Sequence, residues 1–312
     1  MPAFFFSMNL TAAARLALMT LAAVAAARAD PVAPRMLLLD GTAVGADLVV
    51  VGERGTILRS TDQARTWQAA AVTAAATLTG VSFAAGTPHG WAVGHDALIL
   101  TTTDAGLTWQ KEWQGENLSD SFLDVLALDS RHVIAVGAYG LFLSTGDGGK
   151  TWVRRKILDE DFHLNRLTRG PGGDLYLAGE HGTLLRSPDQ GLTWQRIDSP
   201  YDGSFYGILP LDARTLVAHG LRGRIYRSTD NGGTWILVPN DLRVLIATAL
   251  RLPGDTLLFA GQSRAWFLSR DGGRTVMPWP APFTTAVAKL IALPDGSILA
   301  LGEAGATIVP KP

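Results

Sequence analysis

The stretch TGDGGKTW at residues 145–152 decides the fold, because five other stretches of the chain follow its pattern. In each, Asp follows a Ser or Thr by two residues, and the stretch ends on Thr and then Trp or, once, Val. Their last residues are 41 to 43 residues apart. The six copies are STDQARTW (60–67), TTDAGLTW (102–109), TGDGGKTW (145–152), SPDQGLTW (187–194), STDNGGTW (228–235) and SRDGGRTV (269–276). A repeat of this period indicates a solenoid or a propeller.

A glycine recurs with the same period, about 15 residues before the end of each copy. It occurs once more near the C-terminus, so that seven glycines accompany six copies. The seven marker glycines are Gly52, Gly94, Gly137, Gly179, Gly220, Gly261 and Gly302. Because two markers agree on the period, the sequence predicts seven units.

Each unit is expected to form four short strands. In the second unit they are residues 78–83, 90–94, 97–102 and 107–113, and the third is almost wholly apolar. A strand without a polar face is covered on both sides. Seven four-stranded antiparallel sheets predict an all-β, seven-bladed propeller. A linear solenoid would need polar terminal caps, and the sequence shows none, so closure into a ring is favoured. The seventh unit lacks its copy of the pattern, so either residues 30–39 close its blade or the blade keeps three strands.

The N-terminus carries an export pattern. Residues 16–27 form a 12-residue apolar run that follows Arg15, and ARA at 27–29 is a small-x-small cleavage site. The run is too short to span about 30 Å of hydrocarbon. We therefore predict that residues 1–29 are a cleaved signal peptide, that residues 30–312 form one propeller domain, and that the mature chain is periplasmic and does not span a membrane.

Composition excludes several classes of function. The 27 Lys and Arg balance 28 Asp and Glu, so no overall basic field suggests a nucleic-acid partner. Removing residues 1–29 takes away two arginines and changes the net charge from −1 to −3. Cysteine is absent, which excludes disulfides, thiolate metal sites and a thiol nucleophile.

The repeated stretch is expected to be structural. Its aspartate suits a bond to nearby backbone N–H groups, its glycine allows a positive φ, and its tryptophan buries a large ring. Six aspartates spread around a ring cannot converge on one substrate. These residues are Asp62, Asp104, Asp147, Asp189, Asp230 and Asp271, with Trp67, Trp109, Trp152, Trp194 and Trp235.

The pattern S/T-x-D-x-G-x-T-W is that of the Asp-box, or BNR repeat, of sialidases and other propellers. With entries to the third strand such as GERG (52–55), GAYG (137–140) and GEHG (179–182), residues 36–309 most resemble the photosystem II stability/assembly factor family. That resemblance implies a seven-bladed propeller of the thylakoid lumen or bacterial periplasm. It implies a chaperone-like role in which an arginine-rich patch holds a membrane-protein precursor. Some members are encoded beside resistance-nodulation-division exporters, which suggests an exporter accessory as a variant of this role.

A binding site is expected on the face shared by the turns between second and third strands and the turns that lead into first strands. Residues there differ between blades while the scaffold repeats, so specificity would be encoded there. The alternative is a plain solvated face. The candidate binding residues are Arg54, His95, Tyr139, His163, Arg166, Glu180, His181, Tyr206, Arg222 and Arg264. These side chains suit the binding of a protein partner. We expect the propeller to be a monomer and to need no cofactor.

Two other interpretations are weaker. The histidines come from different blades and lack the spacing of metal ligands, so no metal site is predicted. A sialidase-like glycoside hydrolase would need paired carboxylates, for which Glu53, Glu180 and Glu303 are the candidates. No Arg-Ile-Pro segment of the sialidases occurs, and tandem-propeller glycosidases are about twice this length. We therefore expect no catalytic activity.

Overall fold

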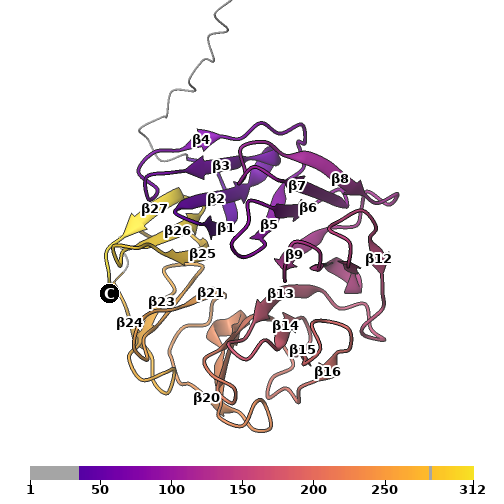
Figure 1. Ribbon diagram of the computed structural model, residues 1–312. Helices are drawn as coiled ribbons and strands as arrows, with labels where there is room; N and C mark the ends of the chain where they lie inside the picture. Colours follow the sequence, from indigo (N-terminus) through magenta and orange to yellow (C-terminus); the bar gives the residue numbers. More distant parts are fainter. Residues whose placement is uncertain (1–34, 281–282) are drawn as a thin grey trace, which may run out of the picture.

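A computed structural model describes residues 35–280 and 283–312. These residues form seven antiparallel sheets arranged around a central axis (Figure 1). Six sheets have four strands in chain order, and the seventh has three. The helical segments of the described residues are three short 3-10 turns, η1 (Glu53–Gly55), η2 (Ala138–Gly140) and η3 (Leu221–Gly223). The predicted all-β, seven-bladed propeller is confirmed. The predicted signal peptide lies outside the described residues.

The first strand of each blade lies nearest the axis, and the second follows it outward (Figure 1). The first strands are β1 (Leu38–Val44), β5 (Leu78–Phe83), β9 (Phe122–Ala127), β13 (Leu164–Arg169), β17 (Phe205–Pro210), β21 (Ile246–Arg251) and β25 (Val287–Ala292). The second strands are β2 (Asp47–Gly52), β6 (Gly90–Gly94), β10 (Val133–Gly137), β14 (Leu175–Gly179), β18 (Leu216–Gly220), β22 (Leu257–Gly261) and β26 (Ile298–Gly302).

The third strands are buried and the fourth strands form the rim. The third strands are β3 (Ile57–Ser60), β7 (Leu98–Thr102), β11 (Phe142–Thr145), β15 (Leu184–Ser187), β19 (Ile225–Ser228), β23 (Trp266–Ser269) and β27 (Gly305–Val309). The fourth strands are β4 (Gln68–Ala69), β8 (Gln110–Gln114), β12 (Val153–Arg154), β16 (Gln195–Arg196), β20 (Ile236–Leu237) and β24 (Met277–Pro278).

The predicted strands of the second unit need two corrections. The third strand begins at Leu98 because Ala97 adopts a left-handed φ of 51°. The fourth strand begins at Gln110 rather than at residue 107. The end of the Asp-box occupies that interval, since the Thr108 N–H donates to the Asp104 carboxylate rather than to a neighbouring strand.

The ring closes by contact between β1 of the first blade and β25 of the seventh. Of the two alternatives for the seventh blade, the described residues show the three-stranded sheet β25-β26-β27. Leu38 and Leu39, the end of the segment expected to close it, belong instead to β1 of the first blade. Residues 30–34 lie outside the described part of the chain.

The marker glycines are required by a close approach between strands. Each first strand has a bulge at its start, opposite the glycine that ends the second strand, as between Leu38 and Asp40 in the first blade. A Cβ on Gly137 would overlap the carbonyl oxygen of Ser121, which precedes β9. The six other marker glycines would overlap a backbone carbonyl at the equivalent place. The glycine recurs in every blade because the bulge recurs there and leaves no room for a Cβ.

The Asp-box is a hydrogen-bonded turn between the third and fourth strands. In the third blade, Asp147 Oδ1 accepts bonds from the Thr151 N–H (2.9 Å) and the Thr145 hydroxyl (2.8 Å). Asp147 Oδ2 accepts from the Thr151 hydroxyl at 2.7 Å. The bonds from Thr151, with that from Thr145, lower the pKa of Asp147 to about 2. Gly149 takes a φ of +89° in the same turn and donates its N–H to the Thr145 hydroxyl.

The box tryptophans pack between blades. Trp109 is 3% exposed and lies in a cluster with Val49 and Val51 of the preceding blade. Trp67 is equally buried and packs on Leu299 of the seventh blade, which places its ring at the closure of the propeller. The rings of Trp152, Trp194 and Trp235 are only half-buried at the equivalent seams. The expectation of five fully buried rings therefore holds for two of them.

Candidate functional site

One face of the propeller is built from the two kinds of turn that the sequence singled out, and we call it the turn face. In every blade, the residue after the marker glycine donates its N–H to the carbonyl that precedes the first strand, at 2.9–3.1 Å. The pairs are Glu53–Leu37, His95–Thr77, Ala138–Ser121, Glu180–His163, Leu221–Ser204, Gln262–Leu245 and Glu303–Ala286. Further bonds join neighbouring blades, such as Gly140 N–H to Phe162 O at 2.9 Å. The backbone of this face is therefore held at each turn.

Six of the predicted binding residues are exposed in the turns of this face. They are Arg54, His95, Tyr139, His181, Arg222 and Arg264. Arg54, Tyr139, His181 and Arg222 occupy the same turn position with φ between 49° and 56°. The turn geometry is thus constant while the side chain changes from blade to blade, which is the arrangement expected of a surface that encodes specificity.

The arginines differ from the nearby glutamates in their contacts. Within residues 35–280 and 283–312, no ion pair or hydrogen bond engages the guanidinium of Arg54, Arg222 or Arg264. Glu180, by contrast, accepts the His163 N–H at 3.1 Å. Glu53 and Glu303 accept the backbone N–H that precedes their own first strand, at 3.0 and 3.2 Å. These three carboxylates brace the turns, a role that the sequence analysis did not predict.

Four predicted residues meet in one cluster between the third and fourth blades. The Tyr139 ring stands edge-on to His163, with centroids 4.8 Å apart, and Phe162 stacks on His181 at 4.5 Å. His163 Nδ1 lies 3.2 Å from Glu180 Oε1. Tyr139 is 68% exposed, so the cluster offers an aromatic surface beside polar atoms.

Arg166 and Tyr206 do not lie in turns, and the prediction that placed them there is wrong. β13 begins at Leu164 and β17 at Phe205, so both residues belong to first strands beside the axis. The first-strand bulge brings the second and third residues of these strands to the central channel. Both line a cavity of about 290 Å³ at the end of the channel that opens on the turn face. Burial raises the pKa of Tyr206, and the Glu180 carboxylate adds to the effect, so its hydroxyl stays protonated at neutral pH.

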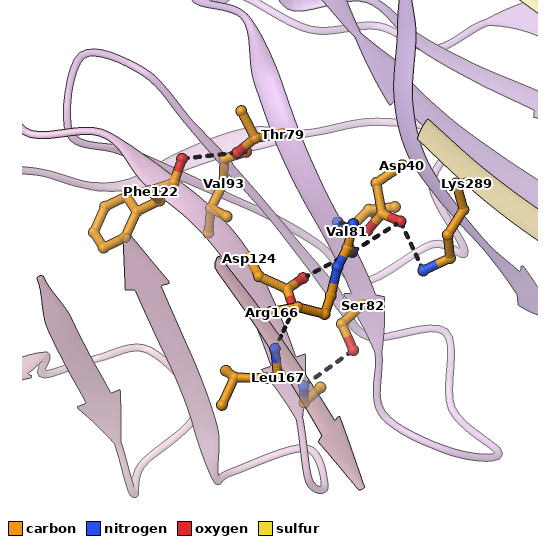
Figure 2. Close-up of polar contacts among 11 residues, drawn as sticks. Asp40, Thr79, Val81, Ser82, Val93, Phe122, Asp124, Arg166, Leu167 and Lys289 are labelled. Atoms are coloured by element: carbon orange, nitrogen blue, oxygen red, sulfur yellow. Dashed lines mark hydrogen bonds and ion pairs between the residues drawn. The ribbon is translucent and has the colours of Figure 1, made fainter. Parts of the chain in front are cut away.

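Arg166 also belongs to a charged quartet, whose contacts Figure 2 shows. It joins Asp40 of β1, Asp124 of β9, Arg166 of β13 and Lys289 of β25. Arg166 Nη1 lies 3.4 Å from Asp40 Oδ1 and 3.4 Å from Asp124 Oδ1. Lys289 Nζ lies 2.8 Å from Asp40 Oδ1. The quartet therefore ties four blades together, including the first and seventh at the closure of the ring.

The two carboxylates of the quartet have different environments. Both are buried, with side chains 2% and 5% exposed. Burial would raise the pKa of Asp40, but Lys289 and Arg166 outweigh it and the pKa is lowered. Burial raises the pKa of Asp124, and Arg166 offsets only part of that effect. Each carboxylate also accepts a bond from a backbone N–H: Asp40 from Val81 at 3.1 Å and Asp124 from Leu167 at 2.7 Å.

Asp40, Asp124 and Lys289 were not among the predicted site residues, although the sequence carries a signal for them. Each is a lone charge inside an apolar first strand, 12 or 13 residues before a marker glycine. Gly80 and Gly207 occupy the same strand position in other blades, and a Cβ on Gly80 would lie 3.3 Å from Asp124 Oδ1. Aligning the seven units on the marker glycine would have shown one ring of charges and small residues.

Comparison with known proteins agrees with this architecture. Residues 110–251 match the family model described as photosynthesis system II assembly factor YCF48. The solved structure "YCF48 bound to D1 peptide" is 20% identical, with a TM-score of 0.70 over 91% of this chain and 96% of that one. Over residues 110–251 the chain is therefore similar to photosystem II assembly factors, and it shares their propeller fold.

Two more solved structures share the fold. YCF48 from Cyanidioschyzon merolae is 18% identical, with a TM-score of 0.73 over 90% of this chain and 97% of that one. The WD40 propeller domain of Doa1 is 12% identical, with a TM-score of 0.68 over 88% of this chain and 92% of that one. At such identities the structures establish the architecture, and function has to be argued from the site. No match was found among curated proteins.

The structure also bears on metals and membranes, and on the carboxylates of the glycosidase interpretation. Outside the undescribed residues 1–34 and 281–282, no three His, Asp or Glu gather closely enough to hold a metal ion. Over the same residues, no helix has the length and apolar character needed to cross a membrane. Glu53, Glu180 and Glu303, the candidate carboxylates of the glycosidase interpretation, each accept a backbone N–H bond.

Proposed function

We propose that this propeller binds an extended segment of a protein partner on its turn face and acts without catalysis. One observation carries the proposal: rigid, equivalent turns present different side chains, among them three exposed arginines that pair with no acidic group of the described chain. Guanidinium groups and aromatic rings are the side chains that protein interfaces use most. The similar structure of YCF48 bound to D1 peptide supports a polypeptide as the ligand.

The cellular role follows as part of the same proposal. The apolar run at residues 16–27 and the cleavage site after it support export to the periplasm. There the propeller would hold a segment of a membrane protein while its complex assembles, acting as a monomer. An exporter subunit would be a second partner of the same kind. Acidic residues in the bound segment are expected, because they would pair with Arg54, Arg222 and Arg264.

The test is a charge-removal series on the mature chain. One variant carries Arg54→Ser, Arg222→Ser and Arg264→Ser on the turn face. The matched control carries Arg131→Ser, Arg214→Ser and Arg270→Ser. These control arginines are also exposed but lie in the turns at the opposite end of the strands, so the change in net charge is identical. Each variant is crosslinked in membranes of the source cells, and recovery of the partner is quantified by mass spectrometry at two salt concentrations.

We expect the turn-face variant to lose about threefold to hundredfold of the captured partner, since three exposed charge pairs at roughly 0.2–1 kcal/mol each contribute about 0.6–3 kcal/mol together. The control variant should retain it, and high salt should weaken capture by the wild type. Equal capture by both variants would refute the proposal. Turnover of aryl glycosides that is lost on Glu180→Gln would replace it with the glycosidase interpretation.

A further inference from the structure

The cavity at the channel mouth has a defined wall. It is lined by the second residue of every first strand, which is the residue added by the bulge. These seven residues are Leu39, Thr79, Leu123, Asn165, Tyr206, Ala247 and Ala288. Arg166, Tyr206 and Ala247 line this cavity and also a second one of about 280 Å³. We call the boundary that these three side chains form between the two cavities the floor.

The wall is asymmetric. Leucine occupies the second position of the first and third blades, whereas the sixth and seventh blades have Ala247 and Ala288. Ala286 and Val287 extend the same side of the wall. The space in the channel mouth therefore results from two small side chains where other blades carry large ones.

The volume and the lining of the cavity indicate which kind of group it can hold. About 290 Å³ is at the lower limit of small-molecule sites, which span roughly 300–1,000 Å³. Most of its lining is aliphatic, and the rest is polar or charged: Thr79, Asn165, Arg166, Tyr206, Gln262 and Glu303. An apolar side chain could enter while amide and carbonyl groups of its backbone meet polar partners at the mouth. Burial of such a side chain is favourable because it leaves water.

We propose that this cavity is an anchor site, which accepts one large apolar side chain (Leu, Met or Phe) of the bound segment against Ala247 and Ala288. This inference rests on the proposed function, and it adds a specificity determinant to it. The partner segment would then combine acidic residues for the arginines of the turn face with one apolar residue over the channel. The charged quartet fixes the floor, since Arg166 is held by two buried carboxylates.

The test fills the cavity. Ala247→Leu and Ala288→Leu, singly and together, place leucine where Leu39 and Leu123 already occur in equivalent strands, so the backbone tolerates it. The matched control is Ala85→Leu, an exposed alanine beside a cavity of about 320 Å³ between the turns that join first and second strands. Random 12-residue peptides displayed on phage are selected on the wild-type mature chain, and thermal melts verify that each variant folds.

The dissociation constants of the selected peptides are then measured on every variant. We expect the Ala247→Leu/Ala288→Leu chain to bind about tenfold to hundredfold more weakly, the contribution of one buried side chain of this size, and Ala85→Leu to bind as the wild type does. Alanine replacement of the apolar peptide residue should cause the same loss on the wild type and little further loss on the filled variant. This second comparison keeps the test valid if a filled variant is unstable.

The outcomes separate the two proposals. Peptides that bind the wild type, depend on the three turn-face arginines and are indifferent to the filled cavity would overturn the anchor site but keep the proposed function. Failure to select any peptide would overturn both. Selected peptides that share no apolar residue would also contradict the anchor site.

Discussion

Replacing Arg166 with methionine tests how the channel is held together. Asp40 would keep Lys289 at 2.8 Å and the Val81 N–H. Among residues 35–280 and 283–312, Asp124 would lose the one cation that contacts it and keep the Leu167 N–H. A buried carboxylate left without its partner costs about 3–5 kcal/mol. At roughly 2–4 °C per kcal/mol for domains of 150–250 residues, we expect the melting temperature to fall by about 6–20 °C.

The matched comparison is Lys289→Met. It removes one of the two cations beside Asp40, so Arg166 still pairs with that carboxylate and the loss should be smaller. Adding Asp124→Asn to Arg166→Met removes the uncompensated charge and should restore most of the lost stability. Burial raises the pKa of Asp124, and loss of Arg166 would raise it further, so the Arg166→Met variant should become relatively more stable as the pH falls and protonation neutralises this carboxylate.

Urea unfolding at several pH values measures these effects. A loss below about 1 kcal/mol for Arg166→Met would refute the reasoning, because it would mean that solvent or another group compensates Asp124. Additive losses for Arg166→Met and Asp124→Asn would refute it as well, since partners in one network should be coupled.

Three further changes probe the scaffold. Trp109→Ala should cost about 3–5 kcal/mol and the half-buried Trp235→Ala clearly less, and equal losses in urea unfolding would contradict the packing of the seams. Gly137→Ala should prevent or strongly weaken folding because its Cβ would overlap the Ser121 carbonyl, whereas Gly172→Ala, with open space around it, should change the melting temperature little. Burial lowers the pKa of His219 to about 4. The stability that the neutral ring contributes is therefore present above pH 6.5 and is lost as the pH falls towards 4, by about 3 kcal/mol. His219→Asn, whose amide can donate to the same Ile246 carbonyl, should remove this pH dependence of the unfolding free energy.

The repeat made the fold predictable because its two markers have local causes. The Asp-box forms its turn from residues within one stretch, and the marker glycine is fixed by the bulge of its own blade. The boundaries of the fourth strand were less predictable because the box extends to its start.

The site was predictable only where it depends on the turns. Tyr139, His163, Glu180 and His181 meet because two neighbouring turns are adjacent in the repeat. Arg166 was assigned to a turn because its strand carries more polar residues than the others. Its partners in the quartet, Asp40, Asp124 and Lys289, come from other blades and meet it at the axis. The spacing within one repeat does not show which residues of different blades meet there.

Site-specific photo-crosslinking tests the central claim most directly. A photoreactive phenylalanine analogue replaces Tyr139, which is 68% exposed on the turn face, or Leu192, which is 72% exposed in an Asp-box at the opposite end of the blade. After irradiation of cells that produce each chain, we predict a crosslink to one membrane-protein partner from position 139 and none from position 192. A crosslink from position 192 alone, or equal crosslinks from both, would contradict binding on the turn face.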